Sequence, residues 1–171
     1  MRAAVRKSDE RKAFRNLDRF LSAVHHEAEA AAKAEAEDYV ALVKSGIGKT
    51  VGPGWAPAWE PLSYYWMSMK TANSDKFWME TGGILKAVDT KMINNTRLKI
   101  LVFAGIRKAD DPDAFERALR NEYGLGLGPE RPLFLPAMDH VSTRVGGGRR
   151  RLNNMARFRA VVPLAIRKVW R

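Results

Sequence analysis

The sequence contains no cysteine among its 171 residues. It therefore forms no disulfide, holds no metal ion through thiolates and has no cysteine nucleophile, which suits folding in a reducing compartment. Histidine is also scarce, with three residues. His25 and His26 lie near Glu29, but a metal-binding helix of the His-Glu-x-x-His type needs a second histidine where Glu29 stands. We expect no metal site and no cofactor.

Long apolar runs are missing as well. No stretch approaches the roughly 18 apolar residues that a membrane span needs. The basic N-terminal segment is not followed by the apolar segment of a secretory signal. At the same time, 46% of the residues are hydrophobic, which is enough to build a core in a chain of this length. The sequence predicts a soluble protein without a membrane partner.

The motifs of common enzymes are also absent. The stretch GIGKT has the ending of a phosphate-binding P-loop, but the first glycine of that motif would have to stand at Val43. No Gly-x-Ser-x-Gly elbow occurs. The acidic cluster Asp110, Asp111 and Asp113 is typical of a helix start, with weak cation binding as the alternative. We expect that the protein is not an enzyme.

Basic charge is abundant and unevenly distributed. The net charge is +11, yet Lys and Arg exceed Asp and Glu by only one in residues 1–48 and by one in residues 49–140. Residues 141–171 contain nine Lys and Arg and no acidic residue. A near-neutral body, residues 1–145, is therefore followed by a basic C-terminal arm, residues 146–171. Such an arm indicates an acidic partner, either nucleic acid or an acidic protein surface.

One long helix is predicted over residues 8–46. Ser8 fits its N-cap and Gly46 its end, with apolar residues three or four positions apart between them. The apolar stripe is thin, so the helix cannot bury itself well against a small body. We expect part of the stripe to pack against copies of the chain or a neighbouring protein, unless the helix simply lies over a sheet. The residues in question are Leu17, Leu21, Val24 and Ala28.

Shorter elements follow in the rest of the body. Pro61 favours a helix start, and alternating residues on both sides of Asn94-Asn95 indicate a hairpin with its turn at that pair. Asp111 and Gly124 fit the two ends of a further helix. The expected fold class is α+β, with the long helix on a small antiparallel sheet and an extended C-terminal arm. The shorter elements are predicted over residues 61–70 (helix), 87–106 (hairpin), 112–123 (helix) and 136–145 (helix).

Seven aromatic residues between positions 55 and 78 have two interpretations. Interleaved with lysines, they could stack nucleic-acid bases. The interpretation that we favour is that Trp55, Tyr65 and Trp66 close the core over the sheet, while the others pack at a subunit contact.

The arm combines arginine with apolar residues in one segment. A solvated tail would explain the charge but not the interleaved hydrophobic side chains, which gain nothing in water. We therefore expect the arm to dock on a neighbouring subunit or partner, with its arginines facing acidic protein or DNA. The residues singled out for this contact are Arg149, Arg150, Arg151, Phe158, Ile166 and Trp170.

Two blocks of the sequence carry a family resemblance. The first runs from GWAPAWEPLSYYWMSMK to METGGILKAV, and the second is RNEYGLGLGPERPLFLPAMDHV. In this order, after a long helix, they resemble the virion morphogenesis, tail-completion or neck proteins of tailed bacteriophages. The resemblance covers residues 8–145. The matching positions are Trp55, Pro57, Leu62, Ser63, Lys70, Thr81, Gly82, Leu85, Glu122, Tyr123, Gly124, Arg131, Pro132, Phe134, Leu135, Pro136 and Ala137.

The resemblance implies a structural role in a virion. Members form a ring, expected to be a hexamer, at the neck or the head-proximal end of the tail. There the ring joins the head connector or head-completion protein to the tail terminator or tail tube. This implies assembly in the bacterial cytoplasm and possible non-specific contact with DNA in the lumen. The alternative is a sequence-independent nucleic-acid-binding protein that grips phosphates with its Arg-rich arm.

Overall fold

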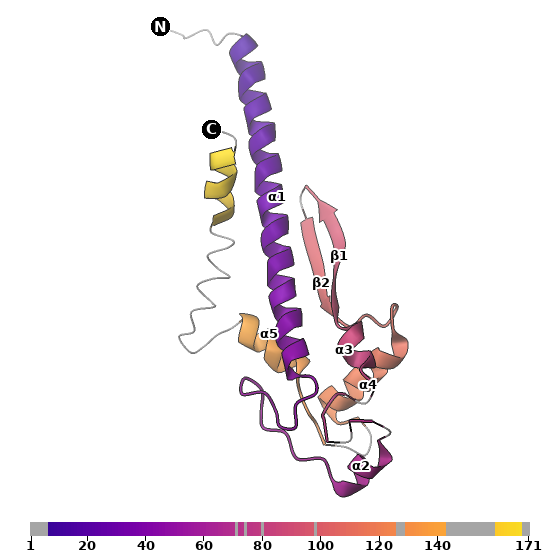
Figure 1. The fold of residues 1–171 in the computed structure, drawn as a ribbon. Coiled ribbons are helices and arrows are strands. Elements are labelled where there is room, and N and C mark those ends of the chain that lie inside the picture. The colour runs from indigo at the N-terminus through magenta and orange to yellow at the C-terminus, as the bar shows by residue number, and fades with distance from the viewer. Residues whose placement is uncertain are drawn as a thin grey trace.

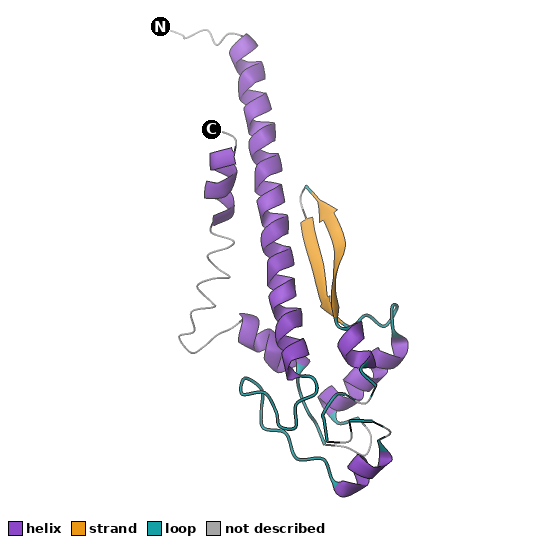
Figure 2. Ribbon diagram, viewed as in Figure 1, coloured by secondary structure: helices purple, strands orange, loops and turns teal. Residues whose placement is uncertain are grey.

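The fold is organised around one long helix, as the computed structural model shows (Figure 1). The structure describes residues 7–70, 72–73, 75–79, 81–97, 99–125, 129–142 and 160–168. The helix has a two-stranded antiparallel sheet on one side and the helix of residues 160–168 on the other, and the short helices gather around its C-terminal end (Figure 2). The predicted α+β class is confirmed.

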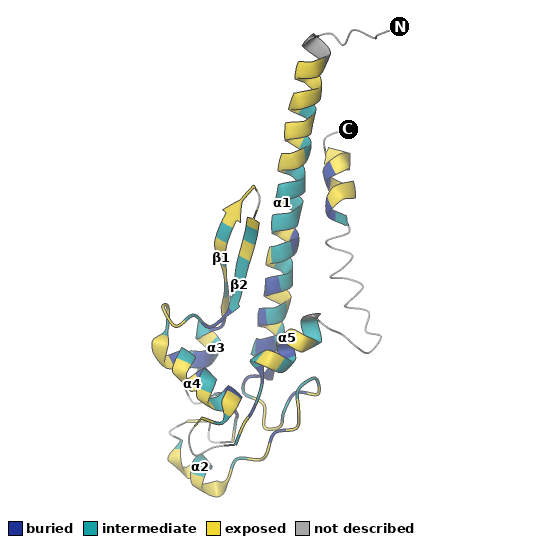
Figure 3. Cartoon of the chain, turned by 180° about the vertical axis from the view of Figure 1, so that it is seen from behind, coloured by how far each residue is buried: buried dark blue, intermediate teal, exposed yellow. Residues whose placement is uncertain are grey.

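Helix α1 spans Lys7–Gly46, which is 40 residues and therefore about 60 Å. It begins one residue before the predicted start and ends at the predicted glycine. Its C-terminal third buries one face in the body, whereas its N-terminal third is largely exposed (Figure 3). None of the described helices, α1 included, has both the length and the apolar character that a membrane crossing requires.

The hairpin consists of β1, Asp89–Thr96, and β2, Lys99–Gly105. The predicted turn at Asn94-Asn95 is wrong, because Thr96 pairs with Lys99 and both asparagines belong to β1. A register shift between Met92 and Asn94 makes Ile93 the extra residue of a bulge, and the ladder continues through both asparagines to Thr96.

Polar contacts tie the hairpin to α1. Arg97 lies 3.0 Å from the carboxylate of Asp18, and the amide of Asn95 donates to Glu29 at 3.0 Å. The hydrogen bonds from Lys33 and Asn95 hold the pKa of Glu29 below its usual value. The hairpin therefore lies along α1 as far as Asp18, and the first turns of the helix extend beyond it.

Two short helices precede the hairpin. Helix α2, Tyr64–Met69, is shorter than the predicted 61–70, because the Ser63 hydroxyl caps it by accepting from Trp66 N–H. Pro61 thus stands before the helix and not in its first turn. Helix α3, Gly83–Ala87, was not predicted, since five residues are too few to show a helical period.

Two further helices follow the hairpin. Helix α4, Pro112–Tyr123, has the predicted bounds, with the Asp111 carboxylate accepting from Ala114 N–H at 2.9 Å and Gly124 at φ 62° closing it. Helix α5, Phe134–Ser142, begins two residues before the predicted 136–145. The last three residues of that prediction lie outside the described part of the chain.

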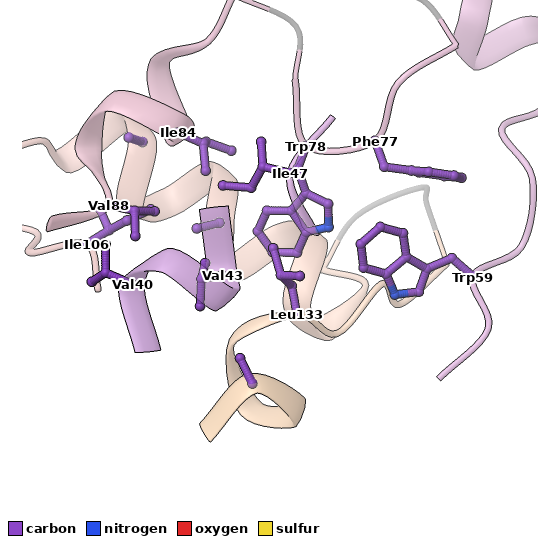
Figure 4. Packing of buried hydrophobic residues seen from close by; sticks show 13 residues of the cluster. Val40, Val43, Ile47, Trp59, Phe77, Trp78, Ile84, Val88, Ile106 and Leu133 are labelled. Atoms are coloured by element: carbon purple, nitrogen blue, oxygen red, sulfur yellow. The ribbon is translucent and has the colours of Figure 1, made fainter. Parts of the chain in front are cut away.

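The core sits where these elements meet the end of α1 (Figure 4). Val43 of α1 and Leu133 before α5 are fully buried in it. Two side chains also donate to the segment that contains Leu133: the Trp59 indole N–H to Pro132 O at 3.1 Å, and the Tyr39 hydroxyl to Phe134 O at 3.2 Å. The members of the core cluster are Val40, Val43, Ile47, Trp59, Phe77, Trp78, Ile84, Val88, Ile106, Ala114, Ala118, Leu133 and Ala137.

Residues 160–168 of the arm form a helix against α1 (Figures 1 and 2). Val161 and Ala165 are buried, and Lys168 forms an ion pair with Glu27 of α1. Proline normally kinks or ends a helix when it stands in the interior, but the described residues on both sides of Pro163 are helical. Part of the arm therefore docks on its own chain.

Candidate functional site

The residues of the second motif block build the junction between α4 and α5. The carboxylate of Glu122 is buried and accepts three backbone N–H groups, from Leu133 at 2.7 Å, Phe134 at 3.0 Å and Leu135 at 2.8 Å. These donors belong to the N-terminus of α5, which lacks intrahelical acceptors. Glu122 thus caps α5 from another helix, and this explains why α5 starts before Pro136.

Arg131 lies directly before this junction and is also buried, with 6% of its surface exposed. Its backbone N–H donates to Asn121 O at 2.8 Å. Its guanidinium carbon lies 4.8 Å from the centre of the Phe77 ring, which is a cation–π contact. Burial lowers the pKa of Arg131, while the charge of Glu60 acts in the opposite direction. An arginine stays protonated at neutral pH even so.

The other motif residues serve the fold in separate places. Gly82 adopts the left-handed conformation, φ 79°, before α3, and Leu85 packs against the core. The Trp55 ring lies 6.2 Å from the ring of His140. Pro57 is exposed, but its carbonyl oxygen approaches Gly52 closely enough to leave no room for a Cβ there. These positions shape the body and form no single site.

A cavity of about 570 Å³ lies between α2, α3, α4 and the segment before α5. It brings together four motif residues that are far apart in the sequence: Leu62, Lys70, Thr81 and Arg131. Arg117 and Arg120 of α4 add two more cations to its lining, so the described lining contains four basic residues and no acidic one. The described lining of the cavity is therefore strongly basic.

The second surface of interest is the apolar stripe of α1. Phe14, Leu17 and Leu21 are 67%, 50% and 38% exposed, and the predicted interface residues Val24 and Ala28 are half-buried. A helix turns about 100° per residue, so this stripe lies between the side of α1 that meets the hairpin and the side that meets the 160–168 helix. Within the described structure the stripe is an open apolar strip with a neighbour on each side.

The arm helix leaves apolar side chains exposed on both sides of the face that meets α1. Val162, Leu164 and Ile166 are exposed, whereas the face towards α1 is formed by Val161 and Ala165. Ile166 is therefore exposed, and its contact with a partner stays a prediction. The other arm residues singled out from the sequence, Arg149, Arg150, Arg151, Phe158 and Trp170, lie outside the described residues.

The aromatic residues are arranged differently from our prediction. Trp59, Phe77 and Trp78 are the ones buried in the core, and Trp55 packs against it from the side. Tyr65 does not close the core but is 60% exposed, because α2 lies at the surface. The rings of Trp59, Phe77 and Trp78 are unavailable for base stacking, since they are buried. They pack in edge-to-face contacts, Trp59 with Phe77 and Trp78 with Phe134.

The acidic cluster takes part in local structure. Asp111 caps α4, and Asp110 lies 3.4 Å from both Lys91 and Arg107. Across the described residues, no group of three His, Asp or Glu side chains is arranged to hold a metal ion.

Sequence reasoning missed the cavity and the role of Glu122. The cap joins residues 11 to 13 positions apart, outside the range of any local capping motif, and the cavity is lined from several separate segments. In comparisons with known proteins, no family model, no curated protein and no solved structure matches this chain.

Proposed function

We propose that this protein is a structural subunit of a tailed-bacteriophage virion, forming a ring at the neck or the head-proximal end of the tail. Three features support the proposal: the two motif blocks, the long helix in front of them, and the exposed stripe of α1. The stripe carries most of the argument, because it is the feature that calls for another protein.

The stripe is apolar surface that one chain alone leaves in water. Phe14 and Leu17 lie on the part of α1 that extends past the hairpin contact at Asp18. Contiguous exposed apolar surface of this kind marks protein–protein contacts. In a ring, the stripe of one subunit would pack on the next, and the exposed face of the arm helix would extend the contact.

The ring would join the head connector or head-completion protein to the tail terminator or tail tube. Its location would be the virion, after assembly in the bacterial cytoplasm. The basic excess of each subunit would place positive charge near the DNA channel, where phosphate contacts are independent of sequence and sensitive to salt.

Light scattering coupled to size-exclusion chromatography tests the proposal directly. We expect the full chain to form a closed oligomer as its concentration rises, and negative-stain images to show rings. A chain ending at residue 145 should form fewer rings while its circular dichroism stays helical. A full chain that remains monomeric at all concentrations and salt levels would contradict self-assembly into a ring.

A second candidate function rests on the charge of the arm. Residues 141–171 carry nine basic residues and no acidic one, and Arg167 is exposed. A nucleic-acid-binding protein would shift duplex DNA in a gel at low salt, with the affinity falling steeply as salt is added. The ion pair of Lys168 with Glu27 weakens this candidate, because the charge of Lys168 is already compensated within the chain.

A further inference from the structure

We propose that the basic cavity between α2 and α4 is a docking site for an acidic peptide segment of a partner protein, with a carboxylate of that segment on Arg131. The proposal goes beyond ring formation, because the cavity is complete within one chain. It also concerns residues that neither the α1 stripe nor the arm contains.

The first argument is charge. Arg117, Arg120 and Arg131 form no ion pair with any carboxylate among the described residues. Arg117 and Arg120 of α4 are exposed, and an exposed arginine commonly has no ion-pair partner. Arg131 is different, because it is more than nine-tenths buried, and the charge of Glu60, which acts on it, forms no direct ion pair with it. A buried cation without a directly paired carboxylate is costly. A carboxylate in the cavity would supply the missing charge.

The second argument is hydrogen bonding. Two buried donors among the cavity-lining residues have no acceptor within the described structure: Nε of Arg131 and the indole nitrogen of Trp78. Buried donors are nearly always satisfied in native proteins, and an unsatisfied one calls for an explanation. Both nitrogen atoms lack accessible surface, so an acidic group in the cavity would reach them only after the lining side chains shift; its oxygen atoms would then accept from both.

The third argument separates a peptide from a small inorganic anion. A volume of about 570 Å³ is in the range of pockets that hold organic ligands, and it far exceeds the room that a phosphate ion fills. Leu62, Trp66 and Met69 provide an apolar wall on one side, and Met69 and Leu125 are exposed at the rim. Aromatic residues, methionine and arginine together are the residue types enriched at protein interfaces. The lining thus suits a carboxylate that is flanked by apolar side chains.

The experiment is a selection from a random 12-residue peptide library with the full-length protein, followed by fluorescence anisotropy of the enriched peptides. We expect enriched sequences to contain Asp or Glu beside an aromatic or aliphatic residue. Changing that acid to its amide should weaken binding about tenfold, since a charge-assisted hydrogen bond is lost. Enrichment of peptides without an acid, or no enrichment, would overturn the proposal.

Three variants locate the binding. Arg131→Met keeps the apolar stem and should also weaken binding about tenfold, with thermal unfolding as the check on its fold. Arg120→Met, at an exposed position, should weaken binding roughly twofold to threefold without affecting the fold. The matched control is Arg19→Met on α1, which removes the same charge far from the cavity. Equal binding by Arg131→Met, Arg120→Met and the wild type would show that the peptides bind elsewhere.

Inorganic phosphate and duplex DNA are the remaining probes. If phosphate alone binds as tightly as the peptides, or if duplex DNA displaces them at physiological salt, the cavity is an anion or nucleic-acid site and the proposal is wrong. Ring formation is measured separately, by light scattering. A failure of the peptide selection therefore leaves the proposed function standing, and a failure of ring formation does not affect the peptide result.

Discussion

The carboxylate of Glu122, near the end of α4, accepts the backbone N–H of Leu133 at 2.7 Å, although the two residues are 11 positions apart. Leu133 has no exposed surface, and the same carboxylate caps the next two residues of the chain. One side chain thus fixes the orientation of α5 relative to α4. Because Arg131 lies two residues before Leu133, the Glu122 carboxylate also fixes one wall of the cavity.

Replacing Glu122 by Ala should cost about 3 kcal/mol of unfolding free energy, because three N–H groups lose their acceptor and only some of them reach water. Glu122→Gln keeps an acceptor oxygen and should cost about 1 kcal/mol. Urea unfolding followed by circular dichroism measures both. Glu116→Ala on the same helix, where the carboxylate pairs with Lys108 at an exposed site, is the control and should change stability by less than about 0.5 kcal/mol. A Glu122→Ala variant as stable as this control would contradict the capping role.

Gly46→Ala should destabilise the protein by about 1–2 kcal/mol, although alanine is the better helix former. A Cβ at this position would lie 2.4 Å from Cδ1 of Leu133, whose side chain has no space to move because it is fully buried. Thermal unfolding is the measurement. Gly54→Ala, where a Cβ would meet nothing within 4 Å, should be neutral or slightly stabilising. Similar effects at both glycines would rule out the predicted clash.

Leu17→Asp together with Leu21→Asp should abolish self-association while leaving the monomer folded. Both leucines are exposed, so the fold does not depend on them, but a charge on the stripe would be desolvated in a subunit contact. Light scattering and circular dichroism report the two effects. The control is Arg19→Asp, an exposed position on another side of α1, which should still associate. Association of the double variant would exclude the stripe as the contact.

Stability should fall above about pH 10, the ordinary pKa of a tyrosine. Burial, together with the charge of Glu122, raises the pKa of Tyr39. The unfolded chain therefore releases the Tyr39 proton at a pH where the folded chain still holds it. The contribution is fully present below pH 10 and decreases by up to about 1.4 kcal/mol per pH unit above it. Denaturant unfolding between pH 8 and pH 11 should show a shallower decline for Tyr39→Phe, and no change of slope for Tyr64→Phe, which is the exposed control.

The sequence predicted the elements whose ends are marked by neighbouring residues. Helix α4 is the clearest example, since Asp111 and Gly124 act on backbone groups within a few positions. The hairpin was predicted but its turn was misplaced, because Asn94-Asn95 is a common turn pair, whereas both asparagines pair within the ladder here. Helix α3 was not predicted, because its five residues are too few to show a helical period.

Less of the candidate site could be predicted from the sequence. The motif residues Lys70 and Arg131 were singled out by resemblance, but nothing local indicates that they line one cavity with Arg117 and Arg120. Likewise, the burial of Val161 and Ala165 follows from docking on α1, which the sequence of the arm alone does not indicate.

The length of α1 has a mechanical consequence. The core holds this helix at Val40 and Val43, near its C-terminal end, the hairpin lies along it as far as Asp18, and Phe14 lies beyond both. If the hairpin and the 160–168 helix move with it, an unbroken helix of about 60 Å acts as a lever, and a tilt of about 10° at the core moves the far end by roughly 10 Å. Small adjustments of packing around Leu133 would therefore be amplified into large displacements of the apolar tip. In an assembled ring, they would set its diameter at that end.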